Sequence, residues 1–269
     1  MDFLQKYGPV LSVVLFFILA FLTYKVYRKL AGKEEKKVAY SPVRFMARVG
    51  IFGAIATILY VVDVFTVKLP FFPSFLSLHF DEIPAFICGY AYGPWAGVAV
   101  IGIKTLIKLP FTTTNTVGEF SDFVMSCLYI IPACLIYDKK RNLKGVAIGF
   151  ALGTVIQILS AMFLNVYVMI PFYSNLYGIP LEGLLAICQM ANPAITDVGW
   201  SYAFFAVLPF NALKDAVVIV ATFLVYRSIH VFLRFDKSGK KKEAPKIIEA
   251  AKPAEGVEPI EAKQDTPKE

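Results

Sequence analysis

The sequence has few charged residues and lacks the short motifs of common enzymes. Only 17% of its 269 residues are charged, and it contains two histidines, His79 and His230. It has no G-x-x-x-x-G-K-[ST] pattern, which excludes nucleotide binding by a P-loop, and no G-x-S-x-G or H-E-x-x-H pattern. We therefore predict a protein that is not an enzyme and that needs neither a cofactor nor a metal.

Cysteine is also scarce, and its spacing points to no metal site. The four cysteines lie in or beside apolar runs, and no two of them have the C-x-x-C spacing. Packing as small apolar residues is the favoured interpretation, with a metal site or a disulfide as the less favoured one. The residues concerned are Cys88, Cys127, Cys134 and Cys188.

Apolar residues, by contrast, are abundant. They make up 57% of the chain, with a mean hydropathy of +0.62, which is more than a soluble domain of this size can bury. A helix needs about 20 apolar residues to span a bilayer. The third and fourth runs overlap in a glycine-rich stretch, which predicts two short helices joined by a tight turn. The seven predicted transmembrane helices cover residues 9–26, 46–66, 83–101, 95–109, 122–137, 145–170 and 201–227.

The first apolar run could be the core of a signal peptide or a retained helix. The residues before it carry little positive charge, and no small-x-small cleavage site follows it. We therefore interpret residues 9–26 as a retained transmembrane helix.

The net charge of +7 comes from basic clusters that lie between the apolar runs. Such clusters mark cytoplasmic loops, and they do not form the continuous basic surface that nucleic-acid binding needs. With residues 25–48 inside, the predicted cytoplasmic segments are residues 90–95, residues 138–144 and the chain after residue 228. The N-terminus is then outside, the C-terminus is cytoplasmic, and no nucleic acid is expected as a partner.

Three parts of the chain differ in composition. Residues 1–40 form an extra helix and a basic linker, and residues 41–232 form a six-helix membrane domain. Residues 233–269 form the C-terminal part, which from Asp236 onward consists largely of Lys, Glu, Pro and Ala without aromatic residues. Such a segment buries too little apolar surface to offset its ordering entropy, so we predict a disordered cytoplasmic tail.

Two of the predicted outside loops are more than simple connections. Loop 67–82 is dense in Phe and Pro, so it must pack onto a ligand or onto the ends of helices. Loop 171–200 contains the segment Pro180–Met190, which could form a short amphipathic helix at the membrane surface.

Polar side chains at membrane depth are the clearest functional signal. Asn211 and Lys214 are three residues apart and share a face of the last predicted helix. Pro209 removes a backbone donor, which frees the carbonyl of Phe205 and kinks the helix nearby. An ionisable residue within a span costs about 3 kcal/mol on insertion scales, so it is seldom there without a role. The pattern predicts a solute pocket, and the alternative is a structural pairing of Lys214 with Asp215 or with the neighbourhood of Lys104.

Other positions allow two interpretations each. Asn165 also lies in a span, where it either joins helices or contacts a ligand. Thr114 and Glu119 belong to a hydroxyl-rich segment before a predicted helix that could contact a ligand, whereas helix capping is the other explanation of Glu119 and Asp122. Gly50 and Ala54 are four residues apart and let another helix approach, either within the bundle or from another subunit.

Several segments together resemble the riboflavin-specific S components of energy-coupling-factor (ECF) transporters. They lie between residues 43 and 227 and read LPFFPSFLSLHFDEIPAFICGYAYGPWAGV, TTTNTVGEFSDF, NVYVMIPFY, MANPAITD and PFNALKD. The resemblance implies an all-α, six-helix bundle in a prokaryotic cytoplasmic membrane that captures a vitamin from outside under an aromatic first loop. The helix at residues 9–26 and the tail lie outside the resemblance.

The resemblance also implies partners and ligand contacts. A membrane T component and two cytoplasmic ATPases on other chains are expected to drive release, with Gly50 and Ala54 docking onto the T component. Asn165, Asn211 and Lys214 are expected to hydrogen-bond the polar edges of the flavin. The predicted binding site further includes Thr114, Glu119, Phe75, Leu78 and Asp81.

Two positions depart from the family's pattern. Asp215 replaces the usual glycine after the lysine, and Ser121-Asp122-Phe123 replaces the usual Ala-Asn-Phe. Both changes bear on which flavin is bound.

The expected ligand is riboflavin, a flat and largely apolar tricycle with polar edges. Aromatic side chains and a few directional polar groups suit such a solute. The outside segments offer only Lys68, Lys108 and His79 as cationic groups for a phosphate, which favours riboflavin over flavin mononucleotide. Two other hypotheses remain: a secondary transporter or channel coupled to an ion through Lys214 and Asp215, which the lack of an internal repeat disfavours, and a structural protein without a ligand.

Overall fold

The computed structural model describes residues 42–234, with side chains up to residue 225, and the isolated positions 18, 21 and 25. The predicted helix at residues 9–26 and the tail after residue 234 therefore lie outside the described residues, apart from those three positions. The elements in chain order are α2 (Pro42–Val61), η1 (Asp63–Phe65), β1 (Val67–Lys68), β2 (Ser77–Leu78), α3 (Glu82–Tyr92), α4 (Pro94–Lys108), η2 (Leu109–Phe111), α5 (Val117–Lys139), α6 (Leu143–Leu164), η3 (Asn165–Met169), α7 (Ile170–Tyr177), α8 (Leu181–Ala191), α9 (Trp200–Tyr202), η4 (Ala203–Val207) and α10 (Leu208–Arg234).

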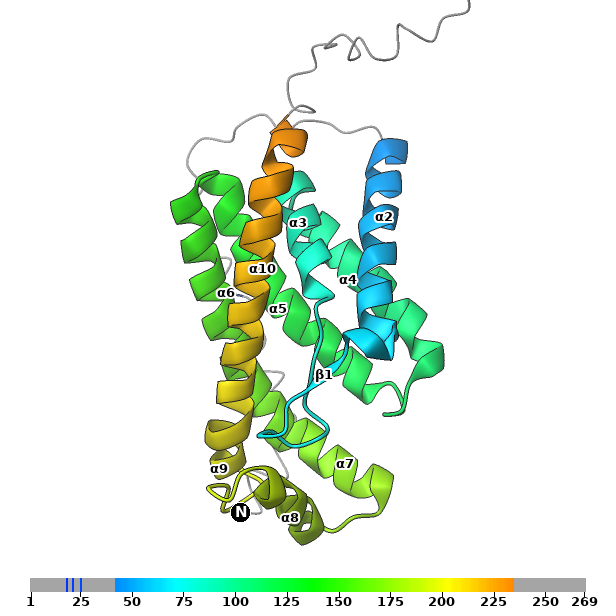
Figure 1. Ribbon diagram of the computed structural model, residues 1–269, viewed down its shortest axis with the longest axis vertical. Coiled ribbons are helices and arrows are strands. Elements are labelled where there is room, and N and C mark those ends of the chain that lie inside the picture. Colours follow the sequence, from blue (N-terminus) through cyan, green and yellow to red (C-terminus); the bar gives the residue numbers. More distant parts are fainter. Residues whose placement is uncertain (1–17, 19–20, 22–24, 26–41, 235–269) are drawn as a thin grey trace, which may run out of the picture.

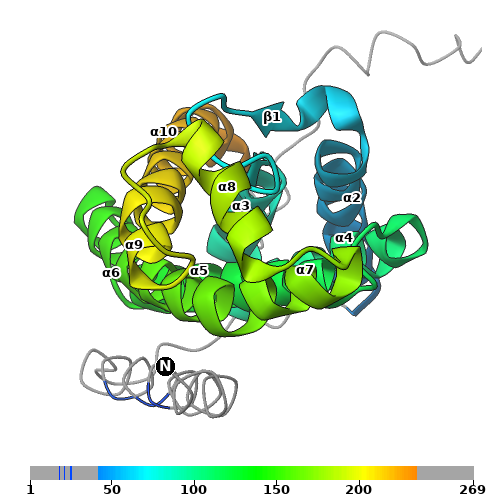
Figure 2. The ribbon, with the colours of Figure 1, turned by 90° about the horizontal axis from the view of Figure 1, so that it is seen from below.

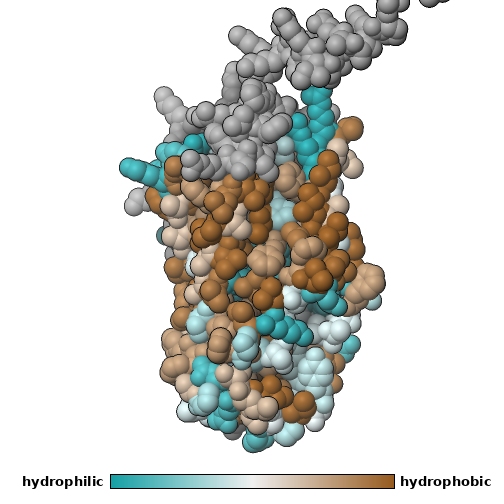
Figure 3. All heavy atoms as spheres, in the orientation of Figure 1, coloured by the Kyte–Doolittle hydropathy of each residue, from teal (hydrophilic) through white to brown (hydrophobic). Residues whose placement is uncertain are grey.

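The described region is an elongated helical bundle, which confirms the predicted all-α class (Figure 1). Five of its stretches are long and apolar enough to cross a membrane, and Figure 3 shows apolar side chains covering most of the height of one face. Those stretches are Pro42–Val61, Pro94–Phe111, Val117–Lys139, Leu143–Tyr177 and Trp200–Val225.

The predicted overlap of the third and fourth spans resolves into two helices. α3 has 11 residues and α4 has 15, and Gly93 separates them. Gly93 has φ = 104°, a conformation that is costly for residues with a side chain, and Pro94 starts the next helix. The tight turn is confirmed, but the 83–101 boundary is wrong because α3 ends at Tyr92 and is too short to cross a bilayer on its own.

The connections between the helices lie at two opposite ends of the bundle. The start of α2, the α3–α4 turn, the α5–α6 turn and the end of α10 meet at the upper end in Figure 1, as the positive-inside pattern requires of one membrane face. The hairpin β1–β2, α7 and α8 lie at the other end. The predicted helix Pro180–Met190 is confirmed as α8 (Leu181–Ala191), and it crosses this end of the bundle (Figure 2).

Two π-helical segments interrupt the long helices near this lower end. η3 (Asn165–Met169) precedes Pro171, and η4 (Ala203–Val207) precedes Pro209. The Nδ2 atom of Asn192 donates a hydrogen bond of 3.1 Å to the carbonyl of Phe205, the group that Pro209 leaves without a helical donor. The kink expected at Pro209 therefore takes the form of a π-helical segment whose free carbonyl is bound by a side chain.

Two large apolar clusters fill most of the described bundle, an inner one toward its upper end in Figure 1 and an outer one toward its lower end, and a small third cluster contains Leu128 and Ile156. On α10, Phe210 belongs to the outer cluster and Val218 to the inner one, with Asn211, Lys214 and Asp215 between them. The same order recurs on α6, where Phe150 lies in the inner cluster, Ala161 in the outer cluster and Gln157 between them. A polar layer therefore separates the two clusters.

Candidate functional site

The polar layer brings together residues from the loop before α3 and from five helices. It is the place where buried polar side chains concentrate in the described part of the chain, and most of its members are less than a tenth exposed. Its members are Asp81, Glu82, Lys104, Asp122, Ser126, Gln157, Asn211, Lys214 and Asp215.

Lys214 lies in this layer and is paired with Glu82, the first residue of α3. Its Nζ atom donates to Oε1 of Glu82 at 2.9 Å, and the hydroxyl of Ser126 donates to the same oxygen at 2.9 Å. The alternative pairing of Lys214 with Asp215 is wrong, because neither carboxylate oxygen of Asp215 has a hydrogen-bond partner. A helix places successive side chains about 100° apart, so Asp215 points in a different direction from Lys214 and does not share its contact with Glu82.

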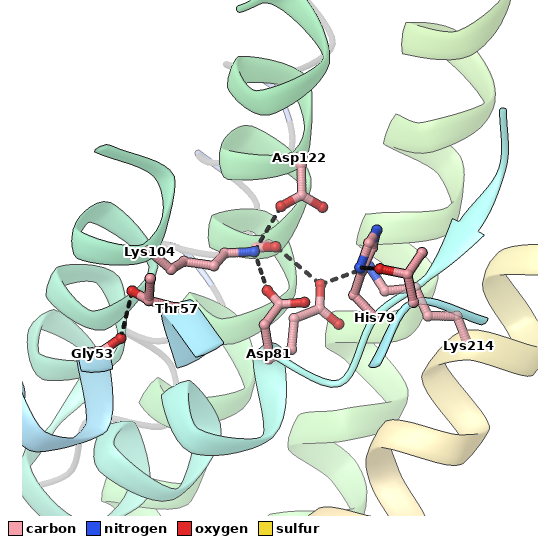
Figure 4. Close-up of polar contacts among 10 residues, drawn as sticks. Gly53, Thr57, His79, Asp81, Lys104, Asp122 and Lys214 are labelled. Carbon is pink, nitrogen blue, oxygen red and sulfur yellow. Dashed lines mark hydrogen bonds and ion pairs between the residues drawn. The ribbon is translucent and has the colours of Figure 1, made fainter. Parts of the chain in front are cut away.

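A second lysine holds two carboxylates beside this pair. The Nζ atom of Lys104 on α4 donates to Asp81, and to Asp122 on α5 at 2.7 Å (Figure 4). It also lies 4.2 Å from the centre of the Tyr60 ring on α2. Lys104 is fully buried, so these contacts fix the end of loop 67–82 against three helices.

The two predicted asparagines make hydrogen bonds at different depths. Asn211 donates to the carbonyl of Val207 at 2.8 Å and accepts from Nε2 of Gln157 at 2.9 Å. Asn165 lies at the start of η3, nearer the lower end, and its Oδ1 accepts from the hydroxyl of Tyr202 at 3.2 Å. Asn211 and Lys214 thus belong to the polar layer, whereas Asn165 lies in the outer cluster.

Loop 67–82 covers these groups as an aromatic lid. Phe72 packs edge-on against Phe210, with ring centres 5.4 Å apart. Phe75 lies 5.6 Å from the ring of Tyr173 and 6.1 Å from that of Tyr202, the partner of Asn165. The loop is anchored by a two-residue antiparallel hairpin in which Val67 pairs with Leu78. The expectation that this apolar loop packs onto helix ends is confirmed, and Leu78 is buried within the outer cluster.

Thr114 and Glu119 form a separate hydrogen-bonded turn at the start of α5. One oxygen of Glu119 accepts from Thr112 at 2.8 Å and from Thr114 at 2.9 Å. Asn115 and Thr116 both have positive φ there, 46° and 70°. The contacts of Glu119 account for its burial through local structure, and they leave its role toward a ligand a prediction.

The predicted docking residues are on the outside of the bundle. Gly50 and Ala54 are both exposed on α2, and a side chain added at Gly50 would meet no atom within 4 Å. The residue of this helix that packs closely inside is Gly53, where an added Cβ would lie 3.0 Å from Ile103. Packing within the described bundle therefore does not explain Gly50 and Ala54.

Carboxylates outnumber ammonium groups in the polar layer. Asp81, Glu82 and Asp122 contact two cations, Lys104 and Lys214, and the fourth carboxyl group, Asp215, is buried without an ion pair, which favours its neutral form. This surplus of negative charge favours a ligand that donates hydrogen bonds and disfavours an anionic one.

His79 lies in the lid beside this layer. Its Nδ1 atom is 3.4 Å from the hydroxyl of Thr66, and its ring packs edge-on against Tyr60. Burial lowers the pKa of His79 below its usual value of 6.5. The imidazole is therefore neutral at physiological pH and adds no cation to the layer.

Sequence reasoning singled out Asp81, Asn211, Lys214 and Asp215 and did not select the other five members of the polar layer as site residues. Lys104 and Gln157 lie inside predicted spans, so the rule that selected Lys214 would have selected them too. Asp122 was explained as a helix cap and Glu82 was not singled out, because a carboxylate near a helix start is common; the structure shows that both contact the lysines.

Two surface grooves contain none of the predicted site residues. One of about 570 Å³ is lined by apolar parts of α4 and α5, and another of about 310 Å³ lies between α6 and α10. Both face outward from the bundle, so neither changes the assignment of the site to the polar layer and its lid.

Comparison with known proteins gives consistent matches. A family model described as "ECF transporter, substrate-specific component" matches residues 44–226. The riboflavin transporter RibU of Staphylococcus aureus (strain TCH60) is 26% identical over 180 residues, which cover 67% of this chain and 88% of the relative. The riboflavin transporter FmnP of Bacillus subtilis (strain 168) is 26% identical over 192 residues, covering 70% of this chain and 94% of the relative.

A solved structure shares the fold. It is described as "Structure and mechanism of the S component of a bacterial ECF transporter" and aligns with a TM-score of 0.58 at 25% identity. The alignment covers 72% of this chain and 99% of that chain.

Proposed function

The chain belongs to the substrate-specific components of ECF transporters, and we propose that the substrate it captures is riboflavin. The family resemblance expected from the sequence is confirmed, and the protein is a substrate-capturing membrane subunit and not an enzyme. The observation that carries the proposal is a polar layer, containing Asn211 and Lys214, that lies next to the phenylalanine-rich lid. Two relatives named riboflavin transporters support the same ligand.

The site suits the two-sided chemistry of this ligand. The rings of Phe72, Phe75 and Tyr173 offer apolar faces to a flat tricycle. The neighbouring polar layer offers directional polar groups. Asn165, Asn211 and Lys214 each bind a protein partner in this structure, so the ligand must exchange those hydrogen bonds for its own.

Riboflavin is favoured over flavin mononucleotide by charge. A phosphate carries close to two negative charges at neutral pH, and the polar layer already has more carboxylates than ammonium groups. Binding a phosphate there would add repulsion without a free cation to offset it.

In transport, the lid end of the bundle faces the outside and the C-terminus faces the cytoplasm. A membrane T component and two ATPases on separate chains supply the energy for release. The exposed pair Gly50 and Ala54 on α2 is the docking surface for the T component. Cysteine labelling at residues 5, 35, 140 and 240 tests this orientation, which fails if residue 140 reacts from outside.

Purification and transport measurements test the function directly. The protein purified in detergent should carry riboflavin, visible as yellow colour and as quenched flavin fluorescence, without ATP. Proteoliposomes with this chain alone should not accumulate riboflavin, whereas those that also contain the T component and the ATPases should. Accumulation by this chain alone would instead favour a secondary transporter, and equal affinity for flavin mononucleotide would contradict the charge argument.

A further inference from the structure

A group of buried oxygen atoms lies on the inner side of the polar layer without hydrogen-bond partners. These atoms are both carboxyl oxygens of Asp215, the hydroxyls of Tyr129 and Thr154, and Oε1 of Gln157. The side chains of Tyr129, Gln157 and Asp215 are fully buried, so bulk solvent does not satisfy them. Buried polar atoms are normally paired, so these oxygens call for a partner other than the described protein groups. We name these four residues the inner oxygen cluster.

The packing of α6 against α10 brings two of its residues together. Nε2 of Gln157 on α6 donates to Oδ1 of Asn211 on α10, so the two helices meet at this level. Thr154 lies about one turn before Gln157, and Asp215 lies about one turn after Asn211. Because α6 and α10 run in opposite directions (Figure 1), both steps lead toward the inner apolar cluster. Thr154 and Asp215 therefore face each other one level further in.

Tyr129 reaches the same place from α5. A Cβ added at Gly153, the residue before Thr154, would lie 2.9 Å from the ring of Tyr129. Tyr129 and Asp215 both approach the hydroxyl of Thr154, yet neither has a hydrogen bond of normal geometry with it. Oxygens that converge without bonding to one another suit a small species that all of them bind at once.

The kinds of atoms identify the class of this species. A carboxyl group, two hydroxyls and an amide carbonyl are ligands that hard cations prefer. The cluster has only one carboxyl group, and the described residues include no group of three His, Cys, Asp or Glu side chains that could hold a metal ion, which disfavours a multivalent metal. We infer that the inner oxygen cluster binds one alkali cation between α5, α6 and α10.

The charges around the cluster fit this inference. Lys214 is paired with Glu82, so it does not neutralise the neighbouring Asp215, and an alkali cation supplies the partner that the ionised carboxylate lacks. Even without Asp215 the polar layer has more carboxylates than lysines, which attracts a cation and repels an anion. A cation on Oε1 of Gln157 also holds Nε2 of the same amide toward Asn211. The site thus positions a residue of the polar layer and binds a second ligand beyond the proposed substrate.

Thermal unfolding of the full chain in detergent, without riboflavin, tests the site. At about ten times the dissociation constant, NaCl or KCl should raise the melting temperature of the wild type by about 3–6 °C over choline chloride of the same ionic strength. Asp215→Asn should be more stable than the wild type in choline chloride, because it lacks the unpaired carboxyl group, but its melting temperature should not respond to either alkali salt. Asp63→Asn, the same change at an exposed position on η1, should keep the wild-type response.

Thr154→Val provides a second variant, because it removes one oxygen at nearly constant volume. It should need severalfold more alkali salt than the wild type for the same rise in melting temperature. This comparison still tests the site if Asp215→Asn fails to fold.

Direct binding of ²²Na⁺ or of ⁸⁶Rb⁺, a substitute for K⁺, completes the test in a scintillation proximity assay. The wild type should retain one of these ions in a form that unlabelled NaCl or KCl displaces and choline chloride does not. Equal melting temperatures of the wild type in all three salts would mean a bound water only and would overturn the inference. It would also be overturned if neither ion bound, or if folded Asp215→Asn or Thr154→Val responded like the wild type. No flavin is used, so these outcomes are independent of the proposed function.

Discussion

Replacing Lys214 with methionine should have two separable effects, because this lysine faces both Glu82 and the proposed ligand position. Methionine keeps roughly the length and volume of the side chain but removes the ammonium group. Glu82 then keeps only the hydroxyl of Ser126 as a donor, in a site where it is 0% exposed. The variant therefore loses stability through an unpaired buried charge and affinity through a missing ligand donor.

The magnitudes follow from these contacts. Removing one partner of a buried ion pair costs about 3–5 kcal/mol of stability. A flavin carbonyl left without its donor costs about 1–3 kcal/mol, which corresponds to roughly tenfold to a hundredfold in the dissociation constant. Adding Glu82→Gln to Lys214→Met removes the unpaired charge, so the double variant should recover most of the stability and none of the affinity.

Two measurements on the same preparations separate the effects. Thermal unfolding in detergent reports the stability, and titration of riboflavin fluorescence reports the affinity. Lys144→Met, a change at an exposed position on α6, serves as the matched control and should alter neither.

Two results would refute this reasoning. If the folded Lys214→Met variant bound riboflavin as tightly as the wild type, Lys214 would not be a ligand donor. If the double variant were no more stable than the single one, the Glu82–Lys214 pair would not determine the loss of stability.

Four further changes test other parts of the site. Phe75→Ala removes two ring contacts of about 0.5–1.5 kcal/mol each, so riboflavin should dissociate about tenfold faster or more in stopped-flow fluorescence, and an unchanged rate would contradict the role of the lid. The lowered pKa of His79 means that the packed lid disfavours the proton, so wild-type affinity should fall as the pH drops below about 6.5, whereas titrations of His79→Gln should show a flatter dependence. Ala54→Trp should leave riboflavin binding intact but weaken uptake and co-purification with the T component, and loss of binding would place Ala54 in internal packing. Asp215→Asn removes a buried carboxylate without a partner, so it should raise the melting temperature in detergent without weakening riboflavin binding, and a weaker affinity would make Asp215 a ligand group.

Most of the fold could be predicted from the sequence because bilayer-spanning helices have a strong local signal. The apolar runs locate α2, α5 and α6 to within a few residues. The pair Gly93-Pro94 marks the turn between α3 and α4, because glycine tolerates positive φ and proline starts helices. The short hairpin of the lid has no such signal, since two-residue strands are too short to show an alternating pattern.

The partners in the polar layer could not be predicted in the same way. Lys214 and Glu82 are 132 residues apart, and only the packing of α3 against α10 brings them into contact. Sequence proximity instead suggested Asp215, whose side chain points in another direction around the helix. The sequence shows which residues are polar. Which of them pair depends on how each helix is rotated about its own axis, and no local sequence pattern encodes that rotation.

The ion pairs of Asp81 and Glu82 hold the point where the lid continues into α3, and this point lies next to the proposed ligand position. Asp81 and Glu82 are consecutive residues where loop 67–82 passes into α3, and they are held by Lys104 from α4 and Lys214 from α10. Lys104 contacts Asp81 and Asp122 and not Asn211 or Lys214, so it keeps this end of the lid fixed. Lys214, in contrast, would have to share its hydrogen bonds between Glu82 and an arriving ligand. A ligand that binds Lys214 therefore acts on the residue from which the lid starts, and capture and lid closure are expected to depend on each other through this one carboxylate.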